Sequence, residues 1–280
     1  MDSLIISLLA ETFIHPGAGQ NMGAIDLPVA RESATGFPFI AGSSFKGSLR
    51  DFAEQQYQGG EKHPEIRKIF GSQESEEGAN SPVGAGALLV SDARLLLLPV
   101  RSLSGPYKWA TCPQLLERYL RDSRRAGRQR ELTIPKVEKG KILCAGSDRV
   151  FLEELSFQAS GLPGSWALEL ISLIPHKETQ NRLTTQLAIL SDQDFAWFTQ
   201  YGLAVQARNQ LDEKKTSQNL WYEESLPPDT LFYGVLAERT SGTLQKVRGW
   251  FQERPYLQLG GGETVGQGWC AVTFPEVTNG

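Results

Sequence analysis

The stretch that decides the fold is HPGAGQNMGAIDLPVARESATGFPFIAGSSFKGSLR, residues 15–50. It follows a mostly apolar run at 4–13, which has the length of a buried strand. It leads into a run at 45–53 whose apolar residues recur at helical spacing. The predicted order is therefore strand, long irregular loop, helix. Loops longer than about 12–15 residues are uncommon and often functional, so this loop is the first candidate for a site.

The entrance to the predicted helix has the composition of a phosphate-binding site. Unpaired N–H groups and the helix dipole attract anions there, and Ser43 or Ser44 is predicted to cap the helix. The motif is not a Walker A loop, because Ser48 stands where that motif needs lysine. An ordinary capped helix with surface cations explains the same residues equally well. The residues expected to contact phosphate are Gly42, Ser43, Ser44, Lys46, Gly47 and Arg50.

A second glycine-rich segment, residues 259–268, lies between two strand-like runs at 256–258 and 269–274. Glycine permits positive φ and lets a ligand approach the backbone. Taken alone, the segment predicts a hairpin loop. Beside the helix entrance, it predicts the other wall of a phosphate-binding groove, formed by Gly260, Gly261, Gly262, Thr264 and Gly266.

Composition limits the class of protein. The 280 residues are 40% hydrophobic and 21% charged, as in an ordinary globular chain. Three widely spaced cysteines predict neither a disulfide framework nor a zinc site. No signal peptide or membrane-spanning run is visible, so we expect a cytoplasmic protein without a membrane partner. The net charge of −4 argues against promiscuous nucleic-acid binding.

The positive charge is concentrated in one segment, because residues 94–149 carry 13 Lys and Arg against five Asp and Glu. Within it, 113–126 is predicted to be a helix with an arginine stripe, which suits a phosphate backbone, an acidic neighbouring subunit or simply solvent.

Further along the chain we expect strands at 151–158, 166–174 and 231–237, helices at 191–205 and 240–251, and a projecting hairpin over 206–233 with its tip at 212–218. Residues 71–87 predict a loop.

Several motifs together resemble those of CRISPR-associated RAMP proteins, and more narrowly the repeated backbone subunit of the Cmr (type III-B) effector complex. They are H-x-G-x-G, DLP, R-E-x-x-T-G-F-P and I-x-G-S-S-x-K-G-x-x-R within residues 15–50. The resemblance continues, in the family's order, through LPVRSLSGPYKWATCP (98–113), FLEEL (151–155), SDQDF (191–195), LWYEESLPPDTLFY (220–233) and GGGETVGQG (260–268).

The order of elements predicts an α+β fold, and the resemblance implies a ferredoxin-like (RRM-like) palm with a helical insertion and a projecting β-hairpin. The aromatic pattern with which RRM sheets stack bases is absent, so the sheet should not be a base-stacking platform. We expect one domain, 1–280, with a palm built from about 1–100, 150–205 and 230–275, a helical insertion at about 101–149 and the hairpin at about 206–229.

The resemblance also implies a function. Such a subunit binds CRISPR guide RNA, forms a helical filament with further copies of itself and other Cmr subunits, and cleaves complementary target RNA at regular intervals. It would be an endoribonuclease that uses a divalent metal ion, Mg or Mn. Two alternatives remain: a RAMP scaffold that binds guide RNA without cleaving, and an unrelated enzyme that binds nucleotide phosphates.

Asp26, in the DLP motif, resembles the residue that the family needs for target cleavage. It would hold the metal ion or orient the attacking 2′-OH. Without the resemblance, Asp26 is explained as a turn residue before Pro28. His15 is a weaker candidate for acid–base chemistry. Glu224 is a candidate to assist Asp26 from the hairpin, although an acid in that position is more often simply solvated.

Overall fold

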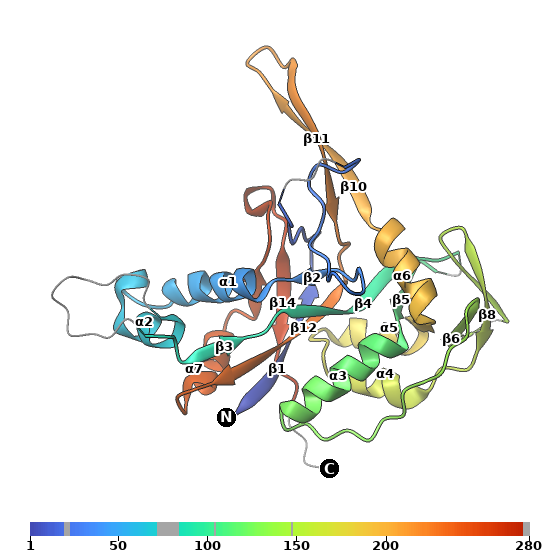
Figure 1. The fold of residues 1–280 in the computed structure, drawn as a ribbon, viewed down its shortest axis with the longest axis horizontal. Helices are drawn as coiled ribbons and strands as arrows, with labels where there is room; N and C mark the ends of the chain where they lie inside the picture. Colours follow the sequence, from blue (N-terminus) through green and yellow to red (C-terminus); the bar gives the residue numbers. More distant parts are fainter. Residues whose placement is uncertain (20–22, 72–83, 104, 147, 277–280) are drawn as a thin grey trace.

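The computed structural model describes residues 1–19, 23–71, 84–103, 105–146 and 148–276. A large mixed sheet runs through the molecule in the order β13-β14-β1-β12-β4-β5-β9-β6-β8-β7, with β2 beside β4 and β3 beside β12 (Figure 1). Its strands are β1 (Ser3–Ala10), β2 (Phe39–Ile40), β3 (Leu88–Val90), β4 (Ala93–Arg101), β5 (Tyr107–Thr111), β6 (Lys141–Cys144), β7 (Arg149–Leu152), β8 (Leu155–Ser160), β9 (Leu187–Leu190), β12 (Leu231–Glu238), β13 (Tyr256–Gln258) and β14 (Trp269–Thr273).

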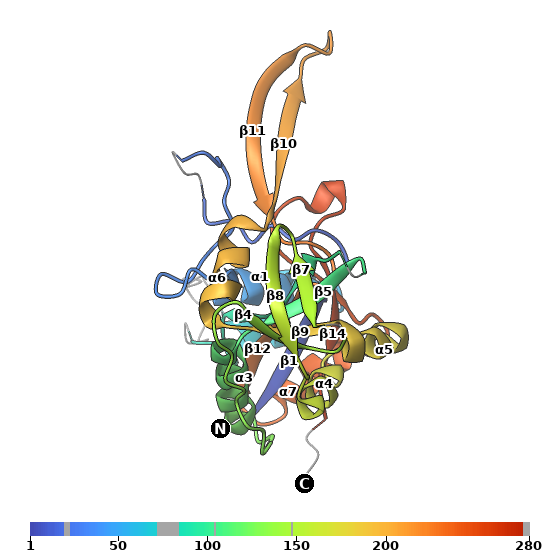
Figure 2. The same ribbon diagram turned by 90° about the vertical axis from the view of Figure 1, so that its right-hand side faces the viewer.

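Helices pack around this sheet, and a separate hairpin projects from it (Figures 1 and 2). The α-helices are α1 (Gly42–Glu54), α2 (Pro64–Phe70), α3 (Pro113–Arg125), α4 (Gly164–Ile171), α5 (Lys177–Gln186), α6 (Asp192–Tyr201) and α7 (Thr243–Trp250). The hairpin consists of β10 (Ala204–Leu211) and β11 (Ser217–Ser225).

The core centres on β1 and β12, which pair antiparallel from Ser3 with Ala237 to Leu9 with Leu231. Every residue of β12 is buried, and so are the last six of β1. Strands covered on both faces have near-continuous apolar sequences, which explains why both runs are recognisable as strands in the sequence. The α+β class is confirmed, whereas the ferredoxin-like palm and its boundaries stay predictions.

Helix α1 buries the predicted face, Phe45, Leu49 and Ala53. The predicted cap is wrong, because Ala41 occupies the N-cap position and makes no side-chain cap bond, while Ser43 and Ser44 are exposed in the first turn. The Asp92 carboxylate, from the turn between β3 and β4, instead accepts the Gly42 amide at 2.7 Å. A long-range carboxylate thus replaces the expected local hydroxyl.

Most of the other predicted elements are present in the structure, and one is wrong. The strand at 151–158 corresponds to β7 and β8, and α3, α6, α7, the hairpin and β12 lie where the sequence predicts them. Ser191 caps α6 by accepting the Asp194 amide. The strand predicted at 166–174 is wrong, because this segment forms α4; a short apolar run without alternation does not distinguish a strand from a buried helix. Residues 72–83 of the predicted 71–87 loop lie outside the described residues.

The segment predicted as a helical insertion, 101–149, contributes more than a helix. It contains α3, but β5 and β6 also join the main sheet, each beside β9. The short apolar run of β9 is not among the strands that the sequence predicts. This segment therefore extends the sheet as well as adding a helix to it.

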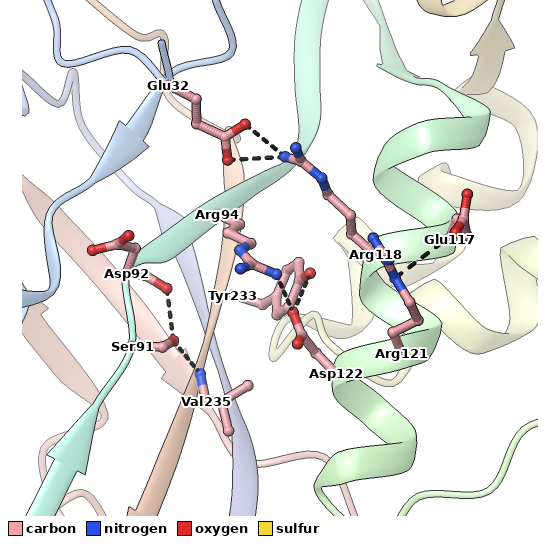
Figure 3. Close-up of polar contacts among 10 residues, drawn as sticks. All are labelled: Glu32, Ser91, Asp92, Arg94, Glu117, Arg118, Arg121, Asp122, Tyr233 and Val235. Atoms are coloured by element: carbon pink, nitrogen blue, oxygen red, sulfur yellow. Dashed lines mark hydrogen bonds and ion pairs between the residues drawn. The ribbon is translucent and has the colours of Figure 1, made fainter. Parts of the chain in front are cut away.

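The predicted arginine stripe is divided between the interior and the surface: Arg118 is half-buried against the long loop (Figure 3), whereas Arg121 and Arg125 are exposed. Arg118 pairs with Glu32 of the long loop at 2.6 Å. Beside it, Arg94 and the Tyr233 hydroxyl both bond Asp122 of α3, at 2.7 and 2.9 Å. Helix α3 therefore anchors the loop and two central strands.

The end of the stripe is also internal. Arg128 is 1% exposed and contacts the Tyr119 hydroxyl at 2.6 Å and the Glu169 carboxylate at 3.2 Å. Arg130 pairs with the same carboxylate at 2.8 Å. Arg121, Arg124 and Arg125 are the exposed arginines of α3.

Candidate active site and nucleic-acid interface

The long loop follows the base of the hairpin (Figure 1). Its backbone pairs with β11 through the Leu27 amide, which donates to the Tyr222 carbonyl at 3.1 Å, and the Glu224 amide, which donates to the Leu27 carbonyl at 3.0 Å. A further bridge joins Ile14 to Leu226. Residues nearly 200 positions apart are thus held side by side at the point where the hairpin leaves the body.

Asp26 lies exposed at this junction. Its Oδ2 accepts the backbone amide of Tyr222 at 2.8 Å, which fixes the carboxylate against β11. Within the described residues, Oδ1 has no hydrogen-bond donor and the carboxylate has no cation partner. An oriented carboxylate with a free oxygen can accept a hydrogen bond from a hydroxyl or hold a cation.

Glu224, the other predicted carboxylate, has the opposite surroundings. It is 3% exposed, Oε1 pairs with Arg31 at 2.6 Å, and Oε2 accepts the Val29 amide at 3.0 Å. Both oxygens therefore hold the loop in place. The prediction that Glu224 assists chemistry has no geometric support, and a positioning role fits its contacts.

His15 is buried beside the same residue. Its Nδ1 lies 2.6 Å from the Glu224 carbonyl oxygen. Because a carbonyl only accepts, Nδ1 must carry the proton, and Nε2 is the remaining basic nitrogen. A Cβ at Gly17 would lie 2.9 Å from Nε2, so a larger residue there would cover this nitrogen. The structure brings His15 and Glu224 together; Asp26 makes no described hydrogen bond with either of them and instead bonds the Tyr222 amide of β11.

The glycine-rich segment folds onto His15. The Gly261 amide donates to the His15 carbonyl at 3.0 Å. Gly260 has φ = 80°, and a Cβ there would lie 2.5 Å from that carbonyl oxygen. Gly262 and Gly266 also have positive φ, and Thr264 is exposed between them. Gly260 and Gly262 therefore serve the close packing of the loop, whereas a Cβ at Gly266 would meet no described atom within 4 Å.

A cationic cleft of about 460 Å³ lies along one side of α1. Four of the six predicted residues of the helix entrance line it, namely Ser43, Lys46, Gly47 and Arg50. Arg239, which follows β12, also lines it and is not predicted by the sequence, since only the fold brings it beside α1. Burial, then Arg239 and Arg50, lower the pKa of Lys46. The mutual repulsion of these cations favours a bound anion.

The predicted two-walled groove does not form in this cleft, because no residue of the glycine-rich segment lines it. Nor is Gly42 open to a ligand. A Cβ there would lie 3.1 Å from the Val90 carbonyl oxygen, and its amide is bonded to Asp92. Gly47 differs, because a Cβ added there would meet no described atom within 4 Å, so this glycine does face open space.

A multidentate metal site is absent from the part of the chain that the structure describes, where no group of three His, Cys, Asp or Glu side chains could hold an ion. Asp26 alone fits magnesium binding through one carboxylate, with water and substrate oxygens completing the shell. No helix among the described residues is long and apolar enough to cross a membrane.

The chain matches a known family along almost its whole length. A family model described as the RAMP superfamily matches residues 7–271. This chain belongs to the RAMP superfamily. The CRISPR system Cmr endoribonuclease Cmr4 of Pyrococcus furiosus is 33% identical over 298 residues, covering 100% of this chain and 98% of that protein. The Cms endoribonuclease Csm3 of Enterococcus italicus is 36% identical over 92 residues, covering 29% and 41%.

Solved structures of the family share the fold. Oligomeric Cmr4 from Pyrococcus furiosus matches with a TM-score of 0.75 and 29% identity, over 99% of this chain and 100% of that one. A chain of the type III-B Cmr-beta complex bound to cognate target RNA matches with a TM-score of 0.75 and 22% identity, over 98% and 97%. The resemblance seen in the sequence motifs is confirmed.

Proposed function

We propose that this RAMP protein is the guide-RNA-binding backbone subunit of a type III-B CRISPR ribonucleoprotein, with a ferredoxin-like palm, and that it cleaves complementary target RNA. The proposal rests chiefly on the surroundings of Asp26. This exposed carboxylate lies at the base of the projecting hairpin, where one oxygen is bonded to the Tyr222 amide and the other is free. The similarity to Cmr4 over the full chain supports the same function.

Guide binding would use the cationic cleft. Lys46, Arg50 and Arg239 offer positive charge to phosphates without reading bases. Sequence recognition would then fall to pairing between guide and target, and the protein would recognise only the shape and backbone of the duplex. This arrangement explains how a chain with a net charge of −4 binds RNA on one surface.

Cleavage would occur where the hairpin meets the RNA. The projecting strands β10 and β11 would distort the duplex and expose one linkage beside Asp26. The free oxygen of Asp26 would orient the 2′-OH of that linkage, whose oxygen attacks the neighbouring phosphorus as its proton is removed. The 5′-oxygen leaves and takes up a proton, so the products end in a 2′,3′-cyclic phosphate and a 5′-OH.

The remaining basic nitrogen of His15, Nε2, would transfer a proton at this junction. Glu224 would keep both loop segments in place. In the alternative arrangement, the free oxygen of Asp26 would hold a divalent ion, Mg or Mn, that would stabilise negative charge on the phosphate. Copies of the chain in a helical filament, together with other Cmr subunits in the cytoplasm, would place one Asp26 at each repeat. The cuts would therefore be evenly spaced.

Replacing Asp26 by asparagine tests the proposal. Asp26→Asn keeps the acceptor for the Tyr222 amide but removes the charge. In the assembled complex, guide and target binding should stay near normal, while cleavage falls by about 10²–10³ at every evenly spaced site. Glu213→Gln, an exposed change at the hairpin tip, is the matched control. A chelator should also stop cleavage by the unmutated complex.

The alternatives predict other outcomes. Full cleavage by Asp26→Asn would identify a scaffold that binds guide RNA without cutting. The unrelated nucleotide-binding enzyme is disfavoured, because the similarity to Cmr4 covers the whole chain and because the Gly42 amide at the start of α1 is already bonded to Asp92.

A further inference from the structure

A second cleft, of about 620 Å³, lies on the other side of α1, between that helix and β13. Its apolar lining includes Phe52, Pro255 and Leu257, with the rings of Tyr256 and Trp269. Tyr256 and Trp269 are 39% and 43% exposed, a large aromatic area left open to solvent. Large exposed apolar patches of this kind usually mark a site where another molecule binds.

The rim of this aromatic cleft is acidic. It carries Glu11, Asp51, Glu253 and Glu263 against a single cation, Arg254. Glu11 pairs with His176 at 2.6 Å, whereas the other three acids have no cationic partner among the described residues. RNA phosphates would be repelled here, in contrast to the cationic cleft across the helix.

Carboxylates beside exposed aromatic faces form a favourable environment for a guanidinium group. The planar group stacks on aromatic rings and bonds carboxylates with its fork of N–H donors. The cleft therefore selects a protein partner that presents arginine.

The same chain presents such a group on another element. Arg124 and Arg125 are exposed in the last turn of α3 and have no acidic partner in the described part of the chain. Arg121, one turn earlier, has only a 3.8 Å contact with Glu117. In Figure 1, α1 lies to the left of β1 and α3 to its right. One copy cannot bring these two surfaces together, but two copies can.

We propose that the aromatic cleft receives Arg124 and Arg125 of a second copy of this chain. Contact between two different surfaces is heterologous, and repeated heterologous contacts build open helical assemblies. The proposal rests on the proposed function, because it identifies the surfaces through which backbone subunits stack. It is independent of how the cationic cleft grips RNA.

Charge reversal on each surface tests the contact. RNA-free, nuclease-treated protein is followed by sedimentation velocity at low and high salt. The cleft variant Asp51→Lys/Glu253→Lys and the α3 variant Arg124→Glu/Arg125→Glu should each weaken self-association by about tenfold or more, because like charges then face each other. Self-association of the unmutated chain should weaken with salt.

The decisive experiment mixes the cleft variant with the α3 variant. The two variants together should co-assemble, since each mixed contact pairs opposite charges: the lysine cleft with the glutamate helix, and the native cleft with the native helix. A chain carrying all four substitutions should also regain self-association. Glu154→Lys/Glu178→Lys, which changes the net charge as much as the cleft variant does but at exposed sites outside the cleft, should leave assembly unchanged.

The proposal is overturned if the unmutated chain stays monomeric, if either reversal leaves assembly unchanged, or if mixing restores nothing. RNA binding by each variant is measured separately. Lys46, Arg50 and Arg239 are unchanged in these variants. A variant that no longer assembles but still binds RNA would therefore have lost only the contact between subunits. If the unmutated chain does not bind RNA, that result would instead contradict the proposed function.

Discussion

Asp26 and Glu224 are carboxylates on two segments that pair at the base of the hairpin, and their surroundings are opposite. Asp26 is exposed and uses one oxygen, bonded to the Tyr222 amide. Glu224 is buried and uses both, on Arg31 and the Val29 amide. A carboxylate whose acceptors are all occupied by its own chain holds structure in place. One with a free, oriented oxygen remains available to a substrate. Burial and bonding thus assign different roles to two carboxylates that the sequence proposes as partners in catalysis.

The largest effect on stability should come from Glu224→Ala. It leaves Arg31 Nη2 and the Val29 amide without their acceptor, while Arg31 Nη1 keeps the Gly36 and Thr199 carbonyls, and we expect a loss of about 3 kcal/mol in the free energy of unfolding. The neighbouring Glu223→Ala removes the longer contacts with Arg208, at 3.5 Å, and with the Gln267 amide, at 3.3 Å, and should cost less than about 1 kcal/mol. Thermal and denaturant unfolding measure both. Equal losses would remove the distinction between the two glutamates.

The pair Arg31–Glu224 should be coupled. Arg31→Met and Glu224→Gln each break the same ion pair, so the double variant should be less destabilised than the sum of the single changes. A coupling free energy of about 1–3 kcal/mol is expected from a double-mutant cycle. Strict additivity would show that the 2.6 Å contact contributes nothing to the loop.

The same contrast applies to the cations of α1. Lys46 has no acidic partner in the described structure and is repelled by Arg239, whereas Arg50 already pairs with Glu54 at 2.7 Å. Lys46→Ala should therefore weaken RNA binding by up to about tenfold and lower the salt slope by about 0.7–0.9. Arg50→Ala should do less of both. Titrations at several salt concentrations compare them, and a larger effect of Arg50→Ala would reverse this ranking.

The smallest effects should come from glycine. Gly47→Ala places a methyl group in open space within a helix, so it should raise the free energy of unfolding by up to about 1 kcal/mol. Gly42→Ala pushes against the Val90 carbonyl and should destabilise the chain. Reduced RNA binding by a stable Gly47→Ala protein would indicate that a phosphate approaches this backbone. Unfolding and RNA titration on the same samples answer both questions.

Much of the fold is predictable because the signals are local. Apolar runs identify β1 and β12, the polar tip at 212–218 identifies the hairpin, and Ser191 marks the start of α6. The run at 166–174 is wrongly predicted as a strand because its apolar residues do not alternate, and packing alone decides between strand and helix there.

The site is predictable only as a set of residues. Motifs locate Asp26, His15 and Lys46, but the contacts that distinguish their roles join positions far apart in the chain. Glu224 meets Arg31 across 193 positions, and Gly42 meets Asp92 across 50. Arg239 and the inward turn of Arg118 and Arg128 follow from the same long-range packing, which no spacing rule anticipates.

The most direct test of the account is a paired measurement of single-turnover target cleavage and melting temperature for complexes assembled from Asp26→Asn or Glu224→Gln subunits. We predict that Asp26→Asn loses about 10²–10³ in cleavage rate with an unchanged melting temperature. Glu224→Gln should lower the melting temperature, and its loss of rate should follow the loss of folded protein. A Glu224→Gln complex that melts normally yet cuts as slowly as Asp26→Asn would make Glu224 a catalytic group and contradict the distinction between the two carboxylates.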